Sequence, residues 1–378
     1  MIYTGRSPET GELLHIHEED GRILTVEETG HSGDAPYIAP GMIDIQVNGF
    51  AGVDYNSPLT PHDEIARSIE VIRSTGVTRF FPTVITSSNE NTTGSLKNLA
   101  KAKRDLAAGN SMSRFHVEGP WISPVDGPRG AHPVEHVRAA TVDEWKQFED
   151  AAEGNIGILT LAPEQEGALP LIEHIAGQGR VVVALGHTNA NTAQIKAAIQ
   201  AGATMSTHLG NGSHQVLARF PNYIIDQMAS DELCAGLIVD GIHLDPNFVK
   251  IAVRAKGLDK SILITDAVSP ANCPPGIYHI GDLEVELTPE NRVELTSSRR
   301  LAGSALCMDQ GLANLIQFAG ITLYQALRMA TVNAAIGAKL ERRQGFLEPG
   351  DLADLILFDH DPAAGRIHIR QTICSPLN

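Results

Sequence analysis

The chain has 378 residues, of which 42% are hydrophobic and 20% charged. This composition favours a sizeable buried core and excludes global disorder. The formal net charge is −16, and no run of Lys or Arg offers the basic face that nucleic acid requires. No uninterrupted apolar stretch reaches the roughly 18 residues of a membrane span, and residues 1–21 lack the layout of a signal peptide. We therefore expect a soluble, cytoplasmic protein that binds neither nucleic acid nor membrane.

The four cysteines, at positions 234, 273, 307 and 374, lie far apart and form no CxxC pair. A disulfide framework or a thiolate zinc site needs closer spacing, so reduced thiols are expected.

Residues 1–40 are polar and turn-rich, with a hairpin signal in EEDGRIL. Eight short, β-branched runs follow, separated by amphipathic helical patterns such as HDEIARSIEVIRST and NTAQIKAAIQAG. The predicted strands are Met42–Val47, Val77–Thr83, Ser113–Glu118, Ile156–Ala162, Val181–Gly186, Ala203–His208, Cys234–Asp240 and Ser261–Asp266. This alternation predicts an α/β fold, a closed (β/α)8 TIM-like barrel, with a doubly wound open sheet as the competing fold.

The two ends of the chain differ from this alternation. Residues 345–359 (GFLEPGDLADLILFD) combine a turn with an apolar run suited to a strand, and Gly276–Leu295 is typical of one or two hairpins. We expect residues 1–40 and 344–378 to pair as a small β-sandwich domain beside a barrel of residues 41–343. A loose N-terminal tail is the alternative.

Polar residues collect where the predicted strands end, and in a parallel barrel these ends converge on one mouth, where active sites lie. Glu118, His187 and His208 supply one carboxylate and two imidazoles, a ligand set that suits one divalent ion with a position open for water. Zn2+ is the expected ion, with Fe2+, Co2+ and Mn2+ as alternatives. Such an ion lowers the pKa of bound water, and Asp266 is the expected acid/base.

Each of these residues also has a structural interpretation. The three ligand candidates would otherwise be hydrogen-bonded core residues, and Asp266 a capping carboxylate. Asp44 is expected to brace its strand, and His116 to be structural rather than a ligand.

Seven motifs occur in an order that resembles the amidohydrolase superfamily, and more narrowly its N-acetylglucosamine-6-phosphate deacetylases. They are PGMIDIQVNGFAG, HVEGPW, GHTNA, THLGNG, DGIHL, LITDA and LAGSAL. The resemblance as a whole spans about residues 38–359. The resemblance implies the barrel, the β-sandwich from both termini, a homodimer, and a metal-dependent hydrolysis of the acetamide of N-acetylglucosamine 6-phosphate. It also implies that Glu118, His187 and His208 hold the metal and that Asp266 is the acid/base residue.

The same resemblance implies the residues that bind substrate. His132, with Ala131 beside it, matches a His that polarises the acetyl carbonyl, and Asn211 and Gly212 match a pair that contacts the sugar phosphate. Arg219 matches an Arg that reaches the phosphate from the neighbouring subunit. The remaining matches are His243, near the substrate, and Leu301, Ala302 and Gly303, which line the sugar pocket.

Two departures from the pattern carry consequences. Gln46 and Asn48 stand where many amidohydrolases have HxH, so both are expected near a single metal ion without ligating a second. HLGNGSHQVLARFPN replaces the usual HL-x-NAM, which keeps another acetamido sugar, phosphorylated or not, or an N-acyl amino acid open as the substrate. The missing HxH keeps a second alternative open, a barrel that binds without catalysis. The Pro- and Gly-rich loop 124–137 is expected to be mobile without ligand.

Overall fold

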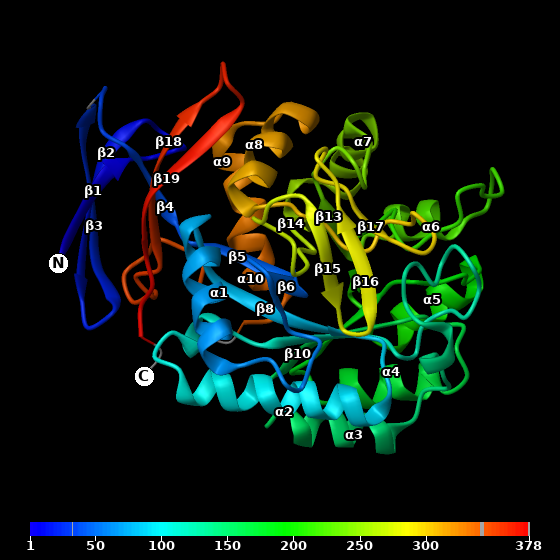
Figure 1. Ribbon diagram of the computed structural model, residues 1–378. Coiled ribbons are helices and arrows are strands. Elements are labelled where there is room, and N and C mark those ends of the chain that lie inside the picture. The colour runs from blue at the N-terminus through cyan, green and yellow to red at the C-terminus, as the bar shows by residue number, and fades with distance from the viewer. Residues whose placement is uncertain (32, 341–343, 377–378) are drawn as a thin grey trace.

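Eight parallel strands form the centre of the computed structural model, which describes residues 1–31, 33–340 and 344–376 (Figure 1). Each strand pairs with its neighbour along the chain, and the Asp266 N–H donates to the Gln46 carbonyl at 3.0 Å, joining the last strand to the first. The strands are β5 (Met42–Val47), β8 (Val77–Ile85), β9 (Phe115–Glu118), β10 (Ile156–Leu161), β11 (Val182–Leu185), β12 (Met205–Ser206), β13 (Cys234–Ile238) and β14 (Ser261–Ile264). The predicted barrel is confirmed.

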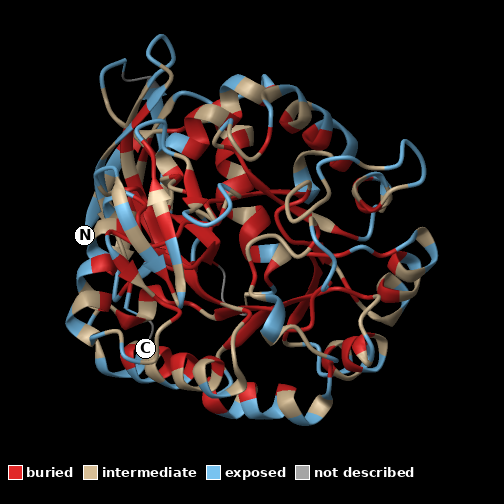
Figure 2. Ribbon diagram, turned by 45° about the vertical axis from the view of Figure 1, so that its right-hand side comes forward, coloured by how far each residue is buried: buried red, intermediate tan, exposed pale blue. Residues whose placement is uncertain are grey.

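Helices surround these strands and bury them almost completely (Figure 2). In the helix of residues 62–74, Ile65, Ile69 and Ile72 are buried, as their spacing predicts. The helices are α1 (His62–Ser74), α2 (Asn89–Asp105), α3 (Val142–Ala151), α4 (Ala168–Gly177), α5 (Thr192–Ala201), α6 (Tyr223–Ala229), α7 (Pro246–Lys256), α8 (Met308–Ala319), α9 (Leu323–Ala330) and α10 (Val332–Gly337). Within the described residues, no helix is long and apolar enough to span a bilayer.

The two ends of the chain meet in a separate six-stranded sheet with the order β19-β18-β4-β1-β2-β3. Its strands are β1 (Ile2–Arg6), β2 (Glu12–Glu19), β3 (Arg22–His31), β4 (Tyr37–Pro40), β18 (Leu355–Asp361) and β19 (Arg366–Ile373). The sheet curls until Ile23 exchanges backbone hydrogen bonds with residues 350 and 351, so that one core holds Ile16 of β2 and Leu355 of β18. The expected β-domain from both termini is therefore present.

A buried ion pair ties this sheet to the barrel. The guanidinium of Arg79 on β8 holds both carboxylate oxygens of Asp354, at 2.6 and 2.8 Å, and also donates to the Ser375 carbonyl at 2.7 Å. The two side chains are 0% and 3% exposed. The exact domain boundaries at 40/41 and 343/344 stay a prediction, and residues 341–343 lie outside the described part of the chain.

A small antiparallel sheet follows β14 and stands at one end of the barrel (Figure 1). It comprises β15 (Gly276–Ile280), β16 (Leu283–Leu287) and β17 (Val293–Leu295), where hairpins were predicted. Two shorter strands, β6 (Gly49–Phe50) and β7 (Val53–Asp54), pair after β5. We call residues 276–300 the insert. They lead directly into the segment Leu301–Gly303 at the pocket.

Candidate active site

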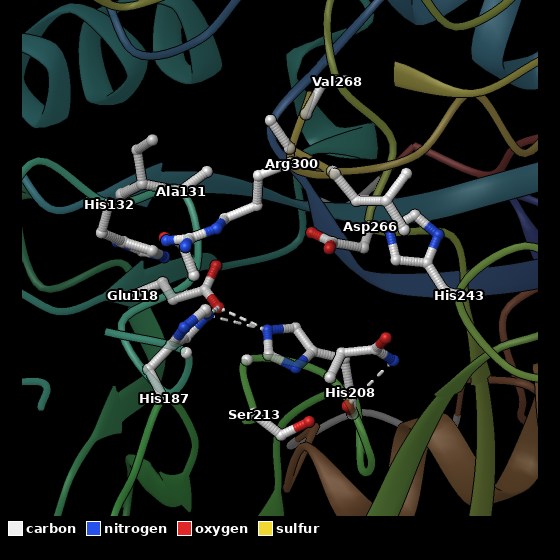
Figure 3. Close-up of a pocket in the computed structure, with 18 of the residues that line it drawn as sticks. Glu118, Ala131, His132, His187, His208, Ser213, His243, Asp266, Val268 and Arg300 are labelled. Atoms are coloured by element: carbon white, nitrogen blue, oxygen red, sulfur yellow. Dashed lines mark hydrogen bonds and ion pairs between the residues drawn. The ribbon is translucent and has the colours of Figure 1, made fainter. Parts of the chain in front are cut away.

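The polar side chains predicted at the strand ends converge in one pocket of about 730 Å3 (Figure 3). Glu118 is the last residue of β9, whereas His187, His208 and Asp266 follow β11, β12 and β14. These three have left-handed backbones, with φ of 49°, 28° and 51°. Side chains other than glycine rarely adopt this conformation, and such strain gathers at functional sites.

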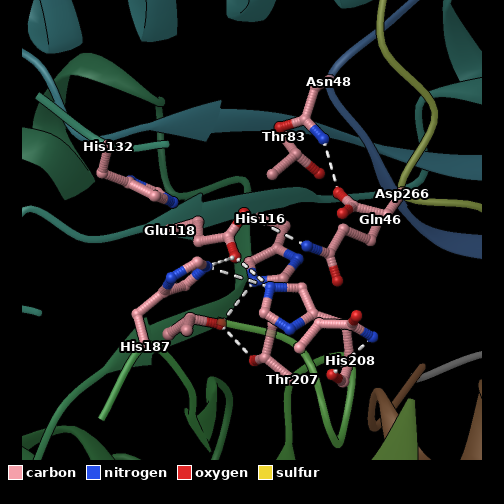
Figure 4. Close-up of polar contacts among 12 residues, drawn as sticks. Gln46, Asn48, Thr83, His116, Glu118, His132, His187, Thr207, His208 and Asp266 are labelled. Atoms are coloured by element: carbon pink, nitrogen blue, oxygen red, sulfur yellow. Dashed lines mark hydrogen bonds and ion pairs between the residues drawn. The ribbon is translucent and has the colours of Figure 1, made fainter. Parts of the chain in front are cut away.

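Three atoms in this pocket form a nearly equilateral triangle (Figure 4). His187 Nε2 and His208 Nε2 lie 3.0 and 2.9 Å from Glu118 Oε1 and 3.0 Å from each other. Ligand atoms of a tetrahedral ion with bonds of about 2.0–2.1 Å are separated by about 3.3 Å. The three residues, which are all buried, thus have the composition and spacing of a divalent metal site.

The hydrogen bonding of His187 supports the same assignment. Its Nδ1 lies 2.9 Å from the Pro128 carbonyl oxygen, which only accepts hydrogen bonds, so Nδ1 carries a proton. This leaves Nε2, which lies 3.0 Å from Glu118 Oε1, as the nitrogen available to a metal ion. A backbone carbonyl that holds the other ring nitrogen is the usual partner of a metal-binding imidazole.

Gln46 and Asn48 each donate to one of the two carboxylates in the pocket (Figure 4). Gln46 Nε2 donates to Glu118 Oε2 at 3.1 Å, leaving Oε1 in the triangle, and Asn48 Nδ2 donates to Asp266 Oδ1 at 2.7 Å. Their amides are thus close to the candidate metal site, as expected from the sequence. Burial and then the charge of Glu118 raise the pKa of Asp266 to about 7, a range suited to a group that takes and returns a proton.

Two further buried side chains, His116 and Asp44, form hydrogen bonds around the site without belonging to the triangle. His116 lies 3.2 Å from the Ile45 carbonyl through Nδ1 and 2.7 Å from Thr160 Oγ1 through Nε2, so both nitrogens are used and the residue is structural, as predicted. Burial lowers its pKa to about 4, which keeps it neutral. Asp44 accepts from the Thr265 hydroxyl and N–H and thereby braces the residue before Asp266.

His132 stands beside His187, and the centroids of the two imidazole rings are 4.2 Å apart. It is 5% exposed, and its Nδ1 lies 2.8 Å from Thr86 Oγ1. Burial, and then the nearby His187, hold its pKa well below the usual value, so the ring is neutral. Ala131 lines the pocket beside it.

Gly212 explains part of the unusual segment after His208. A Cβ at this position would lie 2.6 Å from His187 Nδ1, and its φ is 55°, so a larger residue would displace the imidazole. Asn211 lines the pocket next to it, and its amide donates to the His208 carbonyl. His214 also lines the pocket and is tied to Tyr223 through two contacts of 2.9 Å.

The remaining substrate-binding candidates divide into two groups. His243, Leu301, Ala302 and Gly303 line the pocket, and His243 Nδ1 lies 2.7 Å from Asp240 Oδ2. Arg219 is exposed and does not line the pocket of its own chain.

Sequence reasoning missed several groups that the structure brings to the pocket. Arg292, Arg299 and Arg300 of the insert line it, as does Asp126, and Thr86 and the Pro128 carbonyl contact the two histidines described above. The two arginines directly before the LAG segment, Arg299 and Arg300, could have indicated that the insert reaches the pocket. No local sequence pattern could have indicated that the Pro128 carbonyl contacts His187.

The sequence also matches known proteins over most of its length. The model of the amidohydrolase family matches residues 37–375. The N-acetylglucosamine-6-phosphate deacetylase of Bacillus subtilis (strain 168) is 33% identical over 363 residues, covering 92% of this chain and 89% of the relative. The N-acetylgalactosamine-6-phosphate deacetylase of Escherichia coli O157:H7 is 30% identical over 360 residues, covering 94% and 93%.

Solved structures give the same result. A mutant N-acetyl-D-glucosamine-6-phosphate deacetylase of Mycobacterium smegmatis, in complex with N-acetyl-D-glucosamine-6-phosphate, superimposes with a TM-score of 0.89 at 28% identity, covering 99% of this chain and 98% of that one. The N-acetylglucosamine-6-phosphate deacetylase of Thermotoga maritima has a TM-score of 0.85 at 26% identity, with the same coverage. The barrel, the triangle of Glu118, His187 and His208 and these matches together show that the chain belongs to the amidohydrolase family, hydrolases that act on carbon–nitrogen bonds.

Proposed function

We propose that this chain is a metal-dependent deacetylase that cleaves the acetamide of N-acetylglucosamine 6-phosphate to glucosamine 6-phosphate and acetate. The observation that carries the proposal is the placement of Asp266 in the same pocket as the triangle of Glu118, His187 and His208. The names of the relatives supply the substrate.

One divalent ion held by Glu118, His187 and His208 would lower the pKa of a water molecule and polarise the acetyl carbonyl. Asp266 takes a proton from the water as its oxygen adds to the carbonyl carbon. It then returns this proton to the nitrogen as the carbon–nitrogen bond breaks, which releases the amine and acetate. Burial and the nearby His187 keep His132 neutral, and its Nδ1 lies 2.8 Å from the Thr86 hydroxyl. In the tautomer with the proton on Nε2, that N–H would donate to the developing oxyanion.

The sugar is expected to lie against Ala131, His243 and the segment Leu301–Gly303, with its phosphate at Asn211 and Gly212. Arg219 would complete this phosphate site from a second copy of the chain. Two apolar side chains near Arg219, Val216 and Phe220, are 88% and 72% exposed, which supports contact with another subunit. We therefore propose a homodimer with sites shared between subunits.

Mixing two inactive variants tests this arrangement. Arg219→Ala and Asp266→Asn subunits are unfolded together and refolded as a mixture. Random pairing makes half of the dimers mixed. If Arg219 acts across the interface, each mixed dimer holds one intact site out of two, so about a quarter of the wild-type activity returns. No recovery, with mixed dimers demonstrated, would show that Arg219 has no role in the neighbouring site.

A second substrate deserves a direct comparison, because one relative is named for N-acetylgalactosamine 6-phosphate. Amine release is therefore measured from N-acetylglucosamine 6-phosphate, from N-acetylgalactosamine 6-phosphate, from N-acetylglucosamine and from an N-acetyl amino acid. We expect the highest kcat/KM on the first. A higher value on another acetamide would keep the chemistry and change the substrate, and no turnover of any would refute the proposed activity.

Zn2+ is the proposed ion, because two imidazoles and a carboxylate at this spacing match a catalytic zinc site with an open position. Elemental analysis of the purified protein distinguishes it from Fe2+, Co2+ and Mn2+. A cytoplasmic location is proposed from the four cysteines, all of which are free thiols.

A further inference from the structure

Arg300 extends from the end of the insert toward Ala131 and His132 in the loop of residues 124–137 (Figure 3). Its Nη2 lies 2.8 Å from Asp126 Oδ1, and its Nη1 donates to the Gly130 carbonyl at 2.9 Å. The two partners are four residues apart in the loop, so one planar guanidinium holds the loop at two points. This fork geometry is available to Arg and not to Lys.

The same loop contacts a candidate metal ligand directly. Its Pro128 carbonyl accepts from His187 Nδ1 at 2.9 Å, as described above. A Cβ at Gly130 would lie 3.0 Å from His187 Cε1, and the φ of Gly130 is 62°, so this part of the loop backbone packs against the imidazole ring. The position of the loop thus determines the hydrogen bond that orients His187.

We propose that Arg300 is a positioning residue, which holds loop 124–137 so that the Pro128 carbonyl keeps His187 in the orientation and tautomer that metal binding requires. The expected influence of Arg300 on metal affinity follows from these contacts. Its expected influence on the rate of acetamide hydrolysis rests on the proposed function. The residue acts through the loop, because the hydrogen bonds and ion pairs of the Arg300 guanidinium within the described residues go to Gly130 and Asp126 and not to Glu118, His187 or His208. Partners of this kind, which orient a metal-binding imidazole, tune both affinity and reactivity.

The ion pair alone would be a weak clamp. Asp126 is 74% exposed and Arg300 35% exposed, and pairs in such positions contribute little. The hydrogen bond to Gly130 adds a partner on the backbone next to the imidazole. Arg129 braces the loop from within, donating to the His132 carbonyl at 2.7 Å, whereas Arg300 connects the loop to a separate part of the barrel.

The chain offers a matched control in the neighbouring residue. Arg299 also lines the pocket, but its ion pairs are with Glu286 and Glu294 of the insert. Arg300→Met and Arg299→Met therefore remove the same charge from the same rim, and the first variant alone releases the loop. Arg300→Lys restores a charge without the fork, and Asp126→Asn removes the ion pair from the loop side.

Hydrogen exchange of the amides of residues 126–132 and release of bound Zn2+ to a chelator are measured for each variant, with kcat and KM. We expect Arg300→Met to speed both exchange and zinc release by about threefold to tenfold, less than the roughly 10–100-fold that a direct partner of a ligand costs. Arg300→Lys should recover part of this loss, Asp126→Asn should act in the same direction, and Arg299→Met should change neither quantity. At saturating zinc, Arg300→Met should lower kcat and leave KM unchanged.

Two results would overturn the inference. Exchange and zinc release in Arg300→Met that match Arg299→Met would show that the loop does not depend on Arg300. A higher KM with unchanged zinc release would show that Arg300 binds the substrate instead. If no acetamide is hydrolysed by the wild-type protein, the proposed function fails, while exchange and zinc release still decide the role of Arg300.

Discussion

Asp266→Asn separates the proton transfer from the binding of metal. Asp266 is 8% exposed, and its Oδ1 accepts from Asn48 Nδ2 at 2.7 Å. An asparagine there offers the same acceptor oxygen in the same volume, so neither the fold nor the triangle of Glu118, His187 and His208 should change. The variant loses the carboxylate that takes and returns the proton.

Removing a general acid/base group typically lowers the rate by about 10²–10⁴-fold, which corresponds to about 2.7–5.4 kcal/mol of transition-state stabilisation. We expect a fall of this size in the kcat for amine release, with metal content and unfolding temperature preserved. Asp126→Asn removes another carboxylate from the same pocket and should lower kcat by less than about tenfold, because it acts through the loop and not on the transferred proton. Retention of more than a tenth of the wild-type kcat by Asp266→Asn would refute the assigned role, as would loss of the metal.

Three further outcomes follow from the structure. Burial raises the pKa of Asp44 to about 7, so between about pH 4 and 7 this carboxyl is protonated in the folded protein and ionised in the unfolded chain. Its contribution to the free energy of unfolding should fall by up to about 4 kcal/mol as pH rises across this range. In urea titrations at several pH values, Asp44→Asn should therefore make the fall with pH less steep, and an unchanged slope would contradict the reasoning. Asp354→Ala leaves Arg79 buried without its carboxylate and should cost about 3–5 kcal/mol in the same assay, whereas a loss below about 1 kcal/mol would mean that the ion pair does not secure the terminal sheet. Chelation of the metal should abolish amine release and lower the unfolding temperature, because an ion that binds only the folded state stabilises it. Added Zn2+ should reverse both effects. Full activity after verified metal removal would exclude a catalytic role for the triangle of Glu118, His187 and His208.

The terminal sheet and the insert show how far local patterns reach. The hairpin signal in EEDGRIL, the apolar run within residues 345–359 and the hairpins predicted in Gly276–Leu295 each depend only on neighbouring residues. The curl that brings Ile23 against residues 350 and 351, and the ion pair between Arg79 and Asp354, join parts of the chain about 275 positions or more apart. Periodicity carries no information about such contacts.

The sequence by itself predicted the parallel strands and the residues at their ends, because strands that alternate with helices run parallel and end on one side of the sheet. Glu118, His187, His208 and Asp266 could be named for this reason. Only the tertiary structure decided what orients them: the amides of Gln46 and Asn48 on the carboxylates, the Pro128 carbonyl on His187 and the reach of Arg300 to Gly130, which is 170 positions away. Hydrogen bonds depend on distances of a few tenths of an ångström, and these distances are defined only when the whole chain is packed.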